Sequence, residues 1–337
     1  MIIAQKSSSQ KSSLLIAGLL LGCLALCLSF LVSISWGAAD ISLSEIYRSF
    51  AAFDGSTNHL IIRTVRLPRS LIAIVIGAAL AVAGAIMQGL TLNPLASPGI
   101  LGVNAGAALA VVLVTFLMGS VSSDVYIWFA FAGAAITALS VYLLGSLGRG
   151  GTTPVNLTIA GAALTAFMSS ITSGILILSQ RTLEEIRFWL AGSVASRDLS
   201  LLSQVLPYIG IGLILGLALS KQITILSLGE DIARSLGQST AVIKILAAIS
   251  IILLAGGSVA IAGPIGFVGL IVPNTVRIFV SIDYRWILPY SAILGAIVVL
   301  TADICGRLII QPSELPVGLM MPLIGAPFFI YLIKSAV

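Results

Sequence analysis

Apolar runs close to 20 residues long recur from one end of this 337-residue sequence to the other. A helix needs about 20 mostly apolar residues to cross a hydrocarbon core of about 30 Å, so each run is a candidate membrane span. Hydrophobic residues make up 58% of the chain and charged residues only 9%, which leaves too little polar surface to cover a soluble globule of this length. The sequence therefore predicts an all-α integral membrane protein, since runs of this length come from helices and not from the strands of a barrel.

Ten spans are predicted within one membrane domain covering residues 1–337. Their approximate limits are 14–36, 67–90, 99–118, 125–147, 155–178, 202–219, 241–263, 266–280, 286–308 and 316–334. The eighth is short and contains Pro273, so a re-entrant or broken segment is the alternative there. The first run continues well past Cys23, which favours a retained span over a cleaved signal peptide.

The charges favour an N-terminus on the cytoplasmic side. Lysine and arginine together divide almost evenly between the two sides of a ten-span model, so the positive-inside rule does not decide the orientation. Every lysine falls on the inner side when the N-terminus is inside, however, and most of the acids fall on the outer side.

An internal similarity links the second and seventh predicted spans. Residues 77–94 (GAALAVAGAIMQGLTLNP) align with residues 256–273 (GGSVAIAGPIGFVGLIVP) at a constant offset, and the identical pairs include Gly77 and Gly256, Gly84 and Gly263, and Pro94 and Pro273. Ordinary helix packing would explain the small residues but not the constant offset. Because the second and seventh of ten spans run in opposite directions, the similarity predicts an inverted repeat of the kind found in many transporters.

The chemistry expected of an enzyme is absent from the sequence. The single histidine, His59, lies in a predicted loop, and no Cys, His or carboxylate cluster indicates a catalytic or metal site or a cofactor bound by this chain. No G-x-x-x-x-G-K-[ST] motif is present to hold ATP. Asp303 is the one acid within a predicted span, four residues before Arg307 and near a span end, where both groups could reach water. Uphill transport by such a chain would need energy from another protein, which argues against a secondary carrier.

One compact charged segment, LGEDIARSLG (228–237), separates the sixth and seventh spans. Ser227 lies three residues before Glu230, which predicts a capping box, and Gly237 predicts the helix end. A helix of about nine residues is too short to cross a bilayer. Its apolar residues Leu228 and Ile232 would share one face. Such a helix either rests on the membrane surface or docks a soluble partner.

Several stretches together resemble the permease subunits of the binding-protein-dependent ABC importers for iron–siderophore complexes, haem and cobalamin. They are RLPRSL (66–71), GAALAVAGAIMQ (77–88), NPLASPGILGVNAGA (93–107), LGEDIARSLG (228–237), AGPIGFVGLIVP (262–273), DYRWILPYSAILGA (283–296) and ELPVGLMMPLIGAPFFIYLI (314–333). The resemblance implies a multi-pass protein of the bacterial plasma (inner) membrane with both termini in the cytoplasm. It implies as partners a second permease subunit, in a homodimer or heterodimer, and an extracytoplasmic solute-binding protein. It also implies two cytoplasmic ATPase subunits that use ATP and Mg²⁺, and no nucleic acid.

The resemblance also assigns roles to particular residues. It implies that an ATPase-coupling helix is formed by Leu228, Gly229, Glu230, Asp231, Ala233, Arg234, Leu236 and Gly237. It implies that Arg66, Arg69 and Arg307 dock the binding protein, since a planar guanidinium pairs well with a carboxylate. The alternative is that each is an arginine reaching for water at a span end. Asn93 and Leu95 match a translocation gate, or are simply a turn residue and a packing leucine beside Pro94.

Two further features bear on the family resemblance. Residues 182–192 (TLEEIRFWLAG) resemble a short outer amphipathic helix near the substrate path, and Asn274 stands where many relatives have a histidine. The expected cargo is a ferric siderophore, with cobalamin or haem as the alternative within the family.

Overall fold

The computed structural model describes residues 2–37, 41–147, 153–280, 282–310 and 313–336, and every regular element within these ranges is helical. Seven helices are long and apolar enough to span a membrane, and three shorter apolar helices accompany them. The ten correspond to the ten predicted spans, which confirms the predicted fold class.

The longer apolar helices lie close to the predicted limits, except that α1 begins at Ile2, well before the predicted residue 14. They are α1 (Ile2–Ser35), α4 (Leu67–Thr91), α6 (Ser123–Ser146), α7 (Pro154–Leu178), α9 (Leu199–Ala218) and α15 (Tyr284–Ile309), together with α12 (Thr240–Ile251), which continues through a π-helical turn η3 (Ile252–Gly256) into α13 (Gly257–Ala262). The shorter apolar helices are α5 (Val103–Met118), α14 (Val268–Phe279) and α16 (Val317–Ala336). The doubtful eighth span is α14, a helix of 12 residues with Pro273 inside it.

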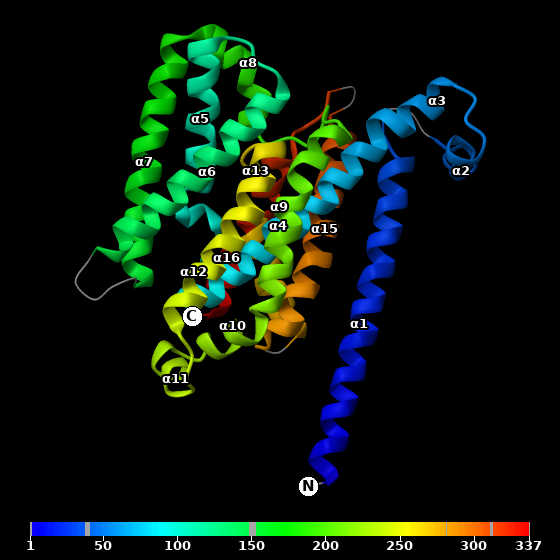
Figure 1. Cartoon of the computed structure of the whole chain (residues 1–337). Coiled ribbons are helices and arrows are strands. Elements are labelled where there is room, and N and C mark those ends of the chain that lie inside the picture. Colours follow the sequence, from blue (N-terminus) through cyan, green and yellow to red (C-terminus); the bar gives the residue numbers. More distant parts are fainter. Residues whose placement is uncertain (1, 38–40, 148–152, 281, 311–312, 337) are drawn as a thin grey trace.

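The remaining helices gather at the two ends of the bundle (Figure 1). One end carries α2 (Leu43–Ala51), α3 (Thr57–Leu60) and α8 (Gln180–Leu190), and we name it the α8 end. The other carries α10 (Ser220–Leu226) and α11 (Glu230–Ser235), and we name it the α11 end. Within the chain, η1 (Ile61–Arg66) joins α3 to α4, and η2 (Pro98–Leu101) precedes α5.

Helix α4 forms the centre of the core. It is apolar around most of its circumference and buried over most of its length, as expected for a helix surrounded by other helices. Glycines let its neighbours approach closely: a methyl group on Gly77 would collide with the carbonyl of Gly295 in α15, and one on Gly84 with the carbonyl of Gly269 in α14. The small residues read from the sequence therefore mark real helix crossings.

The predicted opposite orientation of the second and seventh spans is confirmed, but the aligned residues do not lie at equivalent places in the two helices. Figure 1 shows α4 running away from the α8 end, whereas α12 and α13 run toward it. The aligned residues are not equivalent, however, because Gly84 lies inside α4 while Gly263 ends α13 with φ of +73°. Likewise Pro94 lies in a turn and Pro273 inside a helix. The alignment identifies an antiparallel pair of contacting helices without superposing them residue by residue.

Candidate functional site

At the α11 end, the chain makes a short helical hairpin between α10 and α11. Gly229, with φ of +121°, precedes α11, and Gly237, with φ of +79°, follows it. These two glycines limit α11 to six residues, fewer than the nine expected. Gly237 acts as the predicted stop, since glycine takes a left-handed conformation at little cost.

The predicted capping box at Ser227 is wrong. Ser227 still has helical backbone angles at the end of α10, so its hydroxyl donates back to the carbonyl oxygen of Thr224 at 2.7 Å. A hydroxyl that bonds within its own helix cannot reach the first amides of the next one. Glu230 is consequently free of the capping role and binds elsewhere.

Glu230 ties α11 to α12. Its carboxylate accepts hydrogen bonds from Lys244 Nζ at 2.7 Å, from Thr240 Oγ1 at 3.1 Å and from Arg234 Nη2 at 2.8 Å. The hydrogen bond from Lys244 lowers the pKa of the Glu230 carboxyl, against the opposing effect of partial burial. Lys244 and Thr240 both belong to α12, so this acid holds the hairpin against the bundle.

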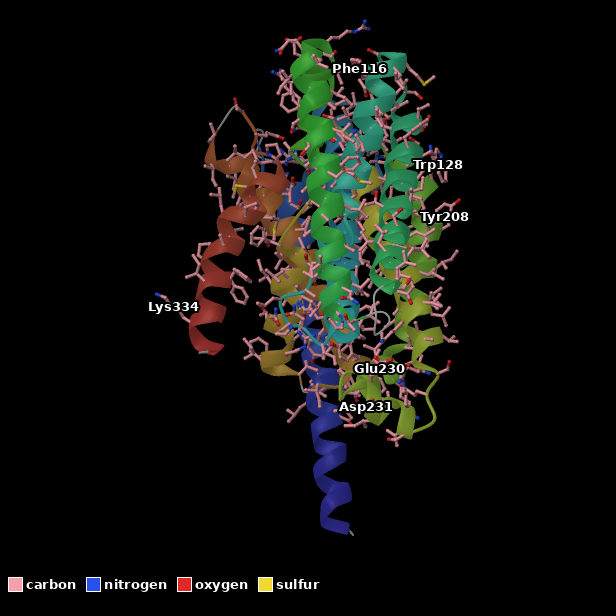
Figure 2. The ribbon with its side chains drawn as sticks, turned by 90° about the vertical axis from the view of Figure 1, so that its left-hand side faces the viewer. Phe116, Trp128, Tyr208, Glu230, Asp231 and Lys334 are labelled. Carbon is pink, nitrogen blue, oxygen red and sulfur yellow. The ribbon has the colours of Figure 1, made fainter. Side chains whose placement is uncertain are left out.

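The outer face of the hairpin is apolar. Leu228 is 48% exposed, Ile232 47% and Leu236 63%, whereas Ala233 is fully buried. Figure 2 places Glu230 and Asp231 near the end of the molecule opposite Phe116. Exposed apolar groups at spacings of four residues form one surface that water solvates poorly. This surface can bind another apolar surface, from a protein or from a membrane interface.

Next to the hairpin, a polar cluster joins α4, α14 and α15. The turn after α4 begins at Leu92 in a left-handed conformation, and the side-chain oxygen of Asn93 accepts from the backbone N–H of Leu95 at 2.9 Å. Asn274 Nδ2 donates to the carbonyl oxygen of Pro94 at 2.8 Å. The predicted gate residues thus lie in a turn that Asn274 fastens to α14.

Arg277 extends this cluster to α15 and α10. Its guanidinium donates to Asn274 Oδ1 at 3.1 Å, to the hydroxyl of Tyr284 at 2.9 Å, and to Gln88 Oε1. The backbone N–H of Tyr284 donates to Thr224 Oγ1 in α10 at 2.9 Å. A continuous chain of hydrogen bonds therefore connects the α10–α11 hairpin to the turn at Pro94.

At the α8 end, the three arginines expected to dock a partner converge, and all three are buried. Arg69 binds Asp303 at 2.9 Å and Glu314 at 2.5 Å, while Arg307 binds Asp303 at 3.2 Å. Arg307 also donates to the carbonyl oxygens of Ser33 and Trp36 at the end of α1. Arg66 donates to the carbonyl oxygens of Ile34 and Ser35 at 2.7 and 2.6 Å.

Asp303 corrects one expectation from the sequence. The predicted pair with Arg307 forms, but Asp303 is fully buried and does not reach water. Arg69, 234 positions away in the sequence, supplies the second charge that makes this burial tolerable. Among the residues that the structure describes, His, Cys, Asp and Glu side chains form no group that could hold a metal ion.

Comparison with known proteins decides the family. Residues 5–335 match the sequence model of the FecCD transport family. The chain belongs to the FecCD transport family.

Relatives of this FecCD-family protein match it along nearly the whole length. It is 46% identical over 329 residues to the "Probable siderophore transport system permease protein YfiZ" of Bacillus subtilis (strain 168), covering 98% of both chains. It is 42% identical to the ferric enterobactin transport system permease protein FepD of Escherichia coli (strain K12), covering 94% of this chain and 93% of the relative. A solved metal-chelate type ABC transporter in an inward-facing conformation is similar with a TM-score of 0.80 at 29% identity, over 94% of this chain and 98% of the other.

Sequence reasoning identified the hairpin, the arginines and the turn of this FecCD-family protein, and it missed most of their partners. Lys244, Gln88, Arg277 and Glu314 complete the sites, and each comes from a different helix or loop than the predicted site residue it completes. From the sequence, Asn274 stands out only as a departure from the common histidine. Its amide both donates to Pro94 and accepts from Arg277, so the position is part of the polar cluster.

Proposed function

We propose that this protein is the membrane-spanning subunit of an ATP-driven importer of iron(III)–siderophore complexes. The observation that carries the proposal is the 46% identity, over 98% of both chains, to a permease named for siderophore transport. Relatives named for iron(3+)-hydroxamate, Fe(3+)-citrate and ferric enterobactin import, at 44, 43 and 42% identity, support the same class of cargo.

The hairpin at the α11 end is the proposed contact with the ATPase. The hairpin exposes Leu228, Ile232 and Leu236, and Glu230 anchors its six-residue helix α11 to α12. Such a short, fixed helix suits insertion into a cleft of a soluble subunit. The ATPase would bind ATP and Mg²⁺ and hydrolyse the nucleotide, because this chain lacks a phosphate-binding loop. In this arrangement the α11 end and both termini are cytoplasmic, in the plasma membrane of a bacterium.

The chain of hydrogen bonds from α10 to Pro94 connects the hairpin to the proposed gate at Asn93 and Leu95. A push on the hairpin would act on Tyr284, then on Arg277 and Asn274, and so on the turn. Packed elements joined by hydrogen bonds can transmit such a displacement. A second permease subunit would complete the pathway across the membrane.

The arginines at the α8 end are the proposed docking site of an extracytoplasmic solute-binding protein. Glu314 is the acid of that cluster nearest to solvent, with its side chain 40% exposed, so a partner carboxylate reaching Arg69 would meet it first. Docking would proceed by joining or replacing Glu314, while Asp303 remains in place.

The test is reconstitution of the permease, its ATPase and its binding protein in proteoliposomes. ATP-dependent uptake of a ferric hydroxamate, catecholate or citrate complex is the expected result. A hemin transport system permease of Yersinia pestis, 36% identical, makes haem the second candidate, and haem is titrated in parallel with cobalamin. Preferred uptake of haem or cobalamin would contradict the siderophore assignment, and uptake driven by a proton gradient without the ATPase would contradict the importer class.

A further inference from the structure

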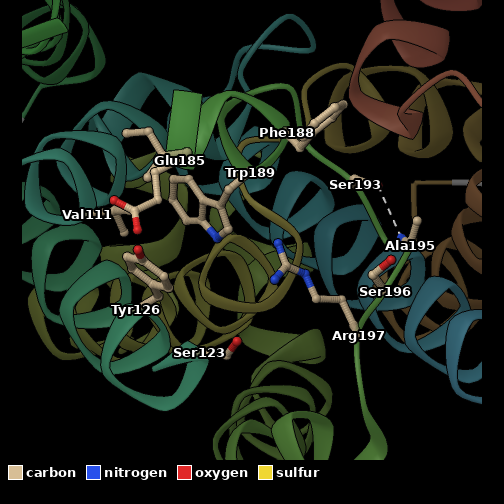
Figure 3. Close-up of a pocket in the computed structure, with 11 residues that line it drawn as sticks. Val111, Ser123, Tyr126, Glu185, Phe188, Trp189, Ser193, Ala195, Ser196 and Arg197 are labelled. Atoms are coloured by element: carbon tan, nitrogen blue, oxygen red, sulfur yellow. Dashed lines mark hydrogen bonds between the residues drawn. The ribbon is translucent and has the colours of Figure 1, made fainter. Parts of the chain in front are cut away.

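A cavity at the α8 end has no part in the functions described so far. It has a volume of about 400 Å³ and lies between α5, α6, α8 and the loop that leads to α9 (Figure 3). Tyr126, Phe188 and Trp189 form aromatic walls, and Ser193 and Ser196 contribute hydroxyl groups. Aromatic walls with a few polar groups are typical of a surface that receives a ligand or a partner side chain.

Arg197 lines this cavity without a partner. Its Nε is buried and makes no hydrogen bond, and its side chain forms no hydrogen bond or ion pair with any residue in the described part of the chain. Burial lowers the pKa of the Arg197 guanidinium, because no anion nearby compensates for the lost hydration. The acid in the same cavity, Glu185, is hydrogen-bonded to the hydroxyl of Ser120 instead.

The cavity is the first of three adjoining hollows. The second, of about 240 Å³, shares Phe188, Ser193 and Ala195 with it and is also lined by Arg69 and Glu314. The third, of about 150 Å³, shares Arg69 and Glu314 with the second. A strip of hollows therefore runs across the α8 end, from Arg197 to the buried arginine cluster.

The four arginines along this strip differ in how many hydrogen-bond and ion-pair partners they have within the chain. Arg69 and Arg307 are bound to Asp303, and Arg66 donates to two backbone carbonyls. Arg197 alone among these four has all its donors available, and a guanidinium pairs strongly with a carboxylate when water is partly excluded. Its position at the far end of the strip suits a partner that covers the whole strip better than a single small anion.

We propose that this strip seats an acidic edge of the extracytoplasmic solute-binding protein, with one of its carboxylates bound to Arg197. The proposal rests on the proposed function and adds to it an anchor outside the arginine cluster. It follows that docking uses a contact which displaces no internal ion pair, whereas contact with Arg69 has to compete with Glu314.

The experiment compares two charge reversals in the complete permease–ATPase complex in lipid nanodiscs. Arg197→Glu changes the proposed anchor. Arg181→Glu makes the same change of charge at an exposed position of α8 that lines none of the three hollows. The dissociation constant for the binding protein is measured at low and high salt. We expect Arg197→Glu to raise this dissociation constant roughly tenfold or more at low salt, and Arg181→Glu to raise it less than about threefold.

A charge swap and a milder variant complete the test. Changing one acid of the binding protein to lysine should restore the affinity for the Arg197→Glu complex alone. Arg197→Gln, which keeps a polar side chain but not the charge, should weaken binding by an intermediate factor. Thermal unfolding and ATP hydrolysis without binding protein are measured for every variant. Because neither readout depends on docking, a variant that merely misfolds is recognised.

Several outcomes overturn the proposal. Equal weakening by Arg197→Glu and Arg181→Glu would mean general attraction only. Unchanged affinity in Arg197→Glu would remove Arg197 from the docking surface. If the complex bound a ferric chelate without the binding protein and Arg197→Glu abolished that binding, the site would belong to a small anion. If the wild-type complex did not bind the binding protein at all, the proposed function itself would fail, which is a distinct result.

Discussion

The two ends of the molecule handle their charged residues in the same way and present different surfaces. At the α8 end, Arg69 and Arg307 share Asp303 inside the protein, and Glu314 supplies the second acid. At the α11 end, Glu230 is likewise turned inward to Lys244, and apolar side chains such as Ile232 and Leu236 face outward. At both ends, charges such as Asp303 and Glu230 are held by partners within the fold. A partner protein can use what this internal network leaves over: the apolar face of the hairpin and the exposed Asp231 at one end, and Arg197 at the other.

The largest effect expected from this comparison is on the stability of the α8 end. Asp303→Ala leaves Arg69 and Arg307 buried without their shared acid, and breaking a buried ion pair costs about 3–5 kcal/mol. Thermal unfolding in detergent or nanodiscs measures it.

Glu314→Gln is the matched control. It removes a negative charge that also pairs with Arg69, but from a side chain that is 40% exposed. We expect it to cost roughly 1 kcal/mol or less. Equal losses from the two substitutions would show that burial of Asp303 does not control the stability of the cluster.

At the α11 end, the largest expected effect is on assembly. Ile232→Asp places a charge in the apolar face, which should weaken binding of the ATPase by roughly tenfold or more, with little change in thermal stability because Ile232 is half exposed. Co-purification of the ATPase with the permease measures it. Ser239→Asp adds the same charge at an exposed serine between α11 and α12 and should leave assembly nearly unchanged. Loss of assembly in both variants would point to charge alone and away from an apolar contact.

The sequence predicted the fold well because the length of an apolar run is a local property. All ten spans follow from it, and Gly237 ends α11 because a single residue type favours that backbone conformation. Local reasoning failed where a side chain had two competing partners. The hydroxyl of Ser227 bonds within α10, so no capping box forms with Glu230. The sequence does not show this because it does not show where α10 ends.

The candidate sites were less predictable for a related reason. The four-residue spacing of Asp303 and Arg307 was visible, but the burial of the pair depends on Arg69, which belongs to another helix. Resemblance to a family selected the arginines and the gate turn without indicating that Asn274 and Arg277 hold that turn. Contacts between distant segments are set by the packing of helices, which no short pattern encodes. The docking role of the arginines and the gating role of Asn93 and Leu95 stay predictions.

The next prediction compares Glu230 with Arg234, two residues that the sequence assigns to the same coupling helix. Arg234 pairs with Glu230 from an exposed position, and such helix pairs contribute only about 0.3–0.5 kcal/mol. Lys244 binds the same carboxylate from a largely buried position on α12. We therefore expect Glu230→Ala to reduce ATP-driven uptake several-fold with hydrolysis continuing, and Arg234→Ala to reduce it less. Full uptake with normally stimulated hydrolysis in the double alanine variant would contradict a coupling role for the hairpin.

The smallest expected effect is the response of the hairpin to pH. The pKa of Glu230 is lowered in the folded protein, first of all by the hydrogen bond from Lys244. A lowered carboxyl pKa means that the contact contributes its full stabilisation above the ordinary pKa of glutamate and loses it as the pH falls through the lowered value. Hydrogen exchange of the α11 amides, corrected for the intrinsic rate, should thus be constant around neutral pH and increase only in acid. In Glu230→Gln the same amides should exchange faster at neutral pH and lack the acid-induced increase. If the exchange rate of Glu230→Gln still increased in acid, groups other than Glu230 would cause the acid response. The contact between α11 and α12 would then not depend on the charge of Glu230.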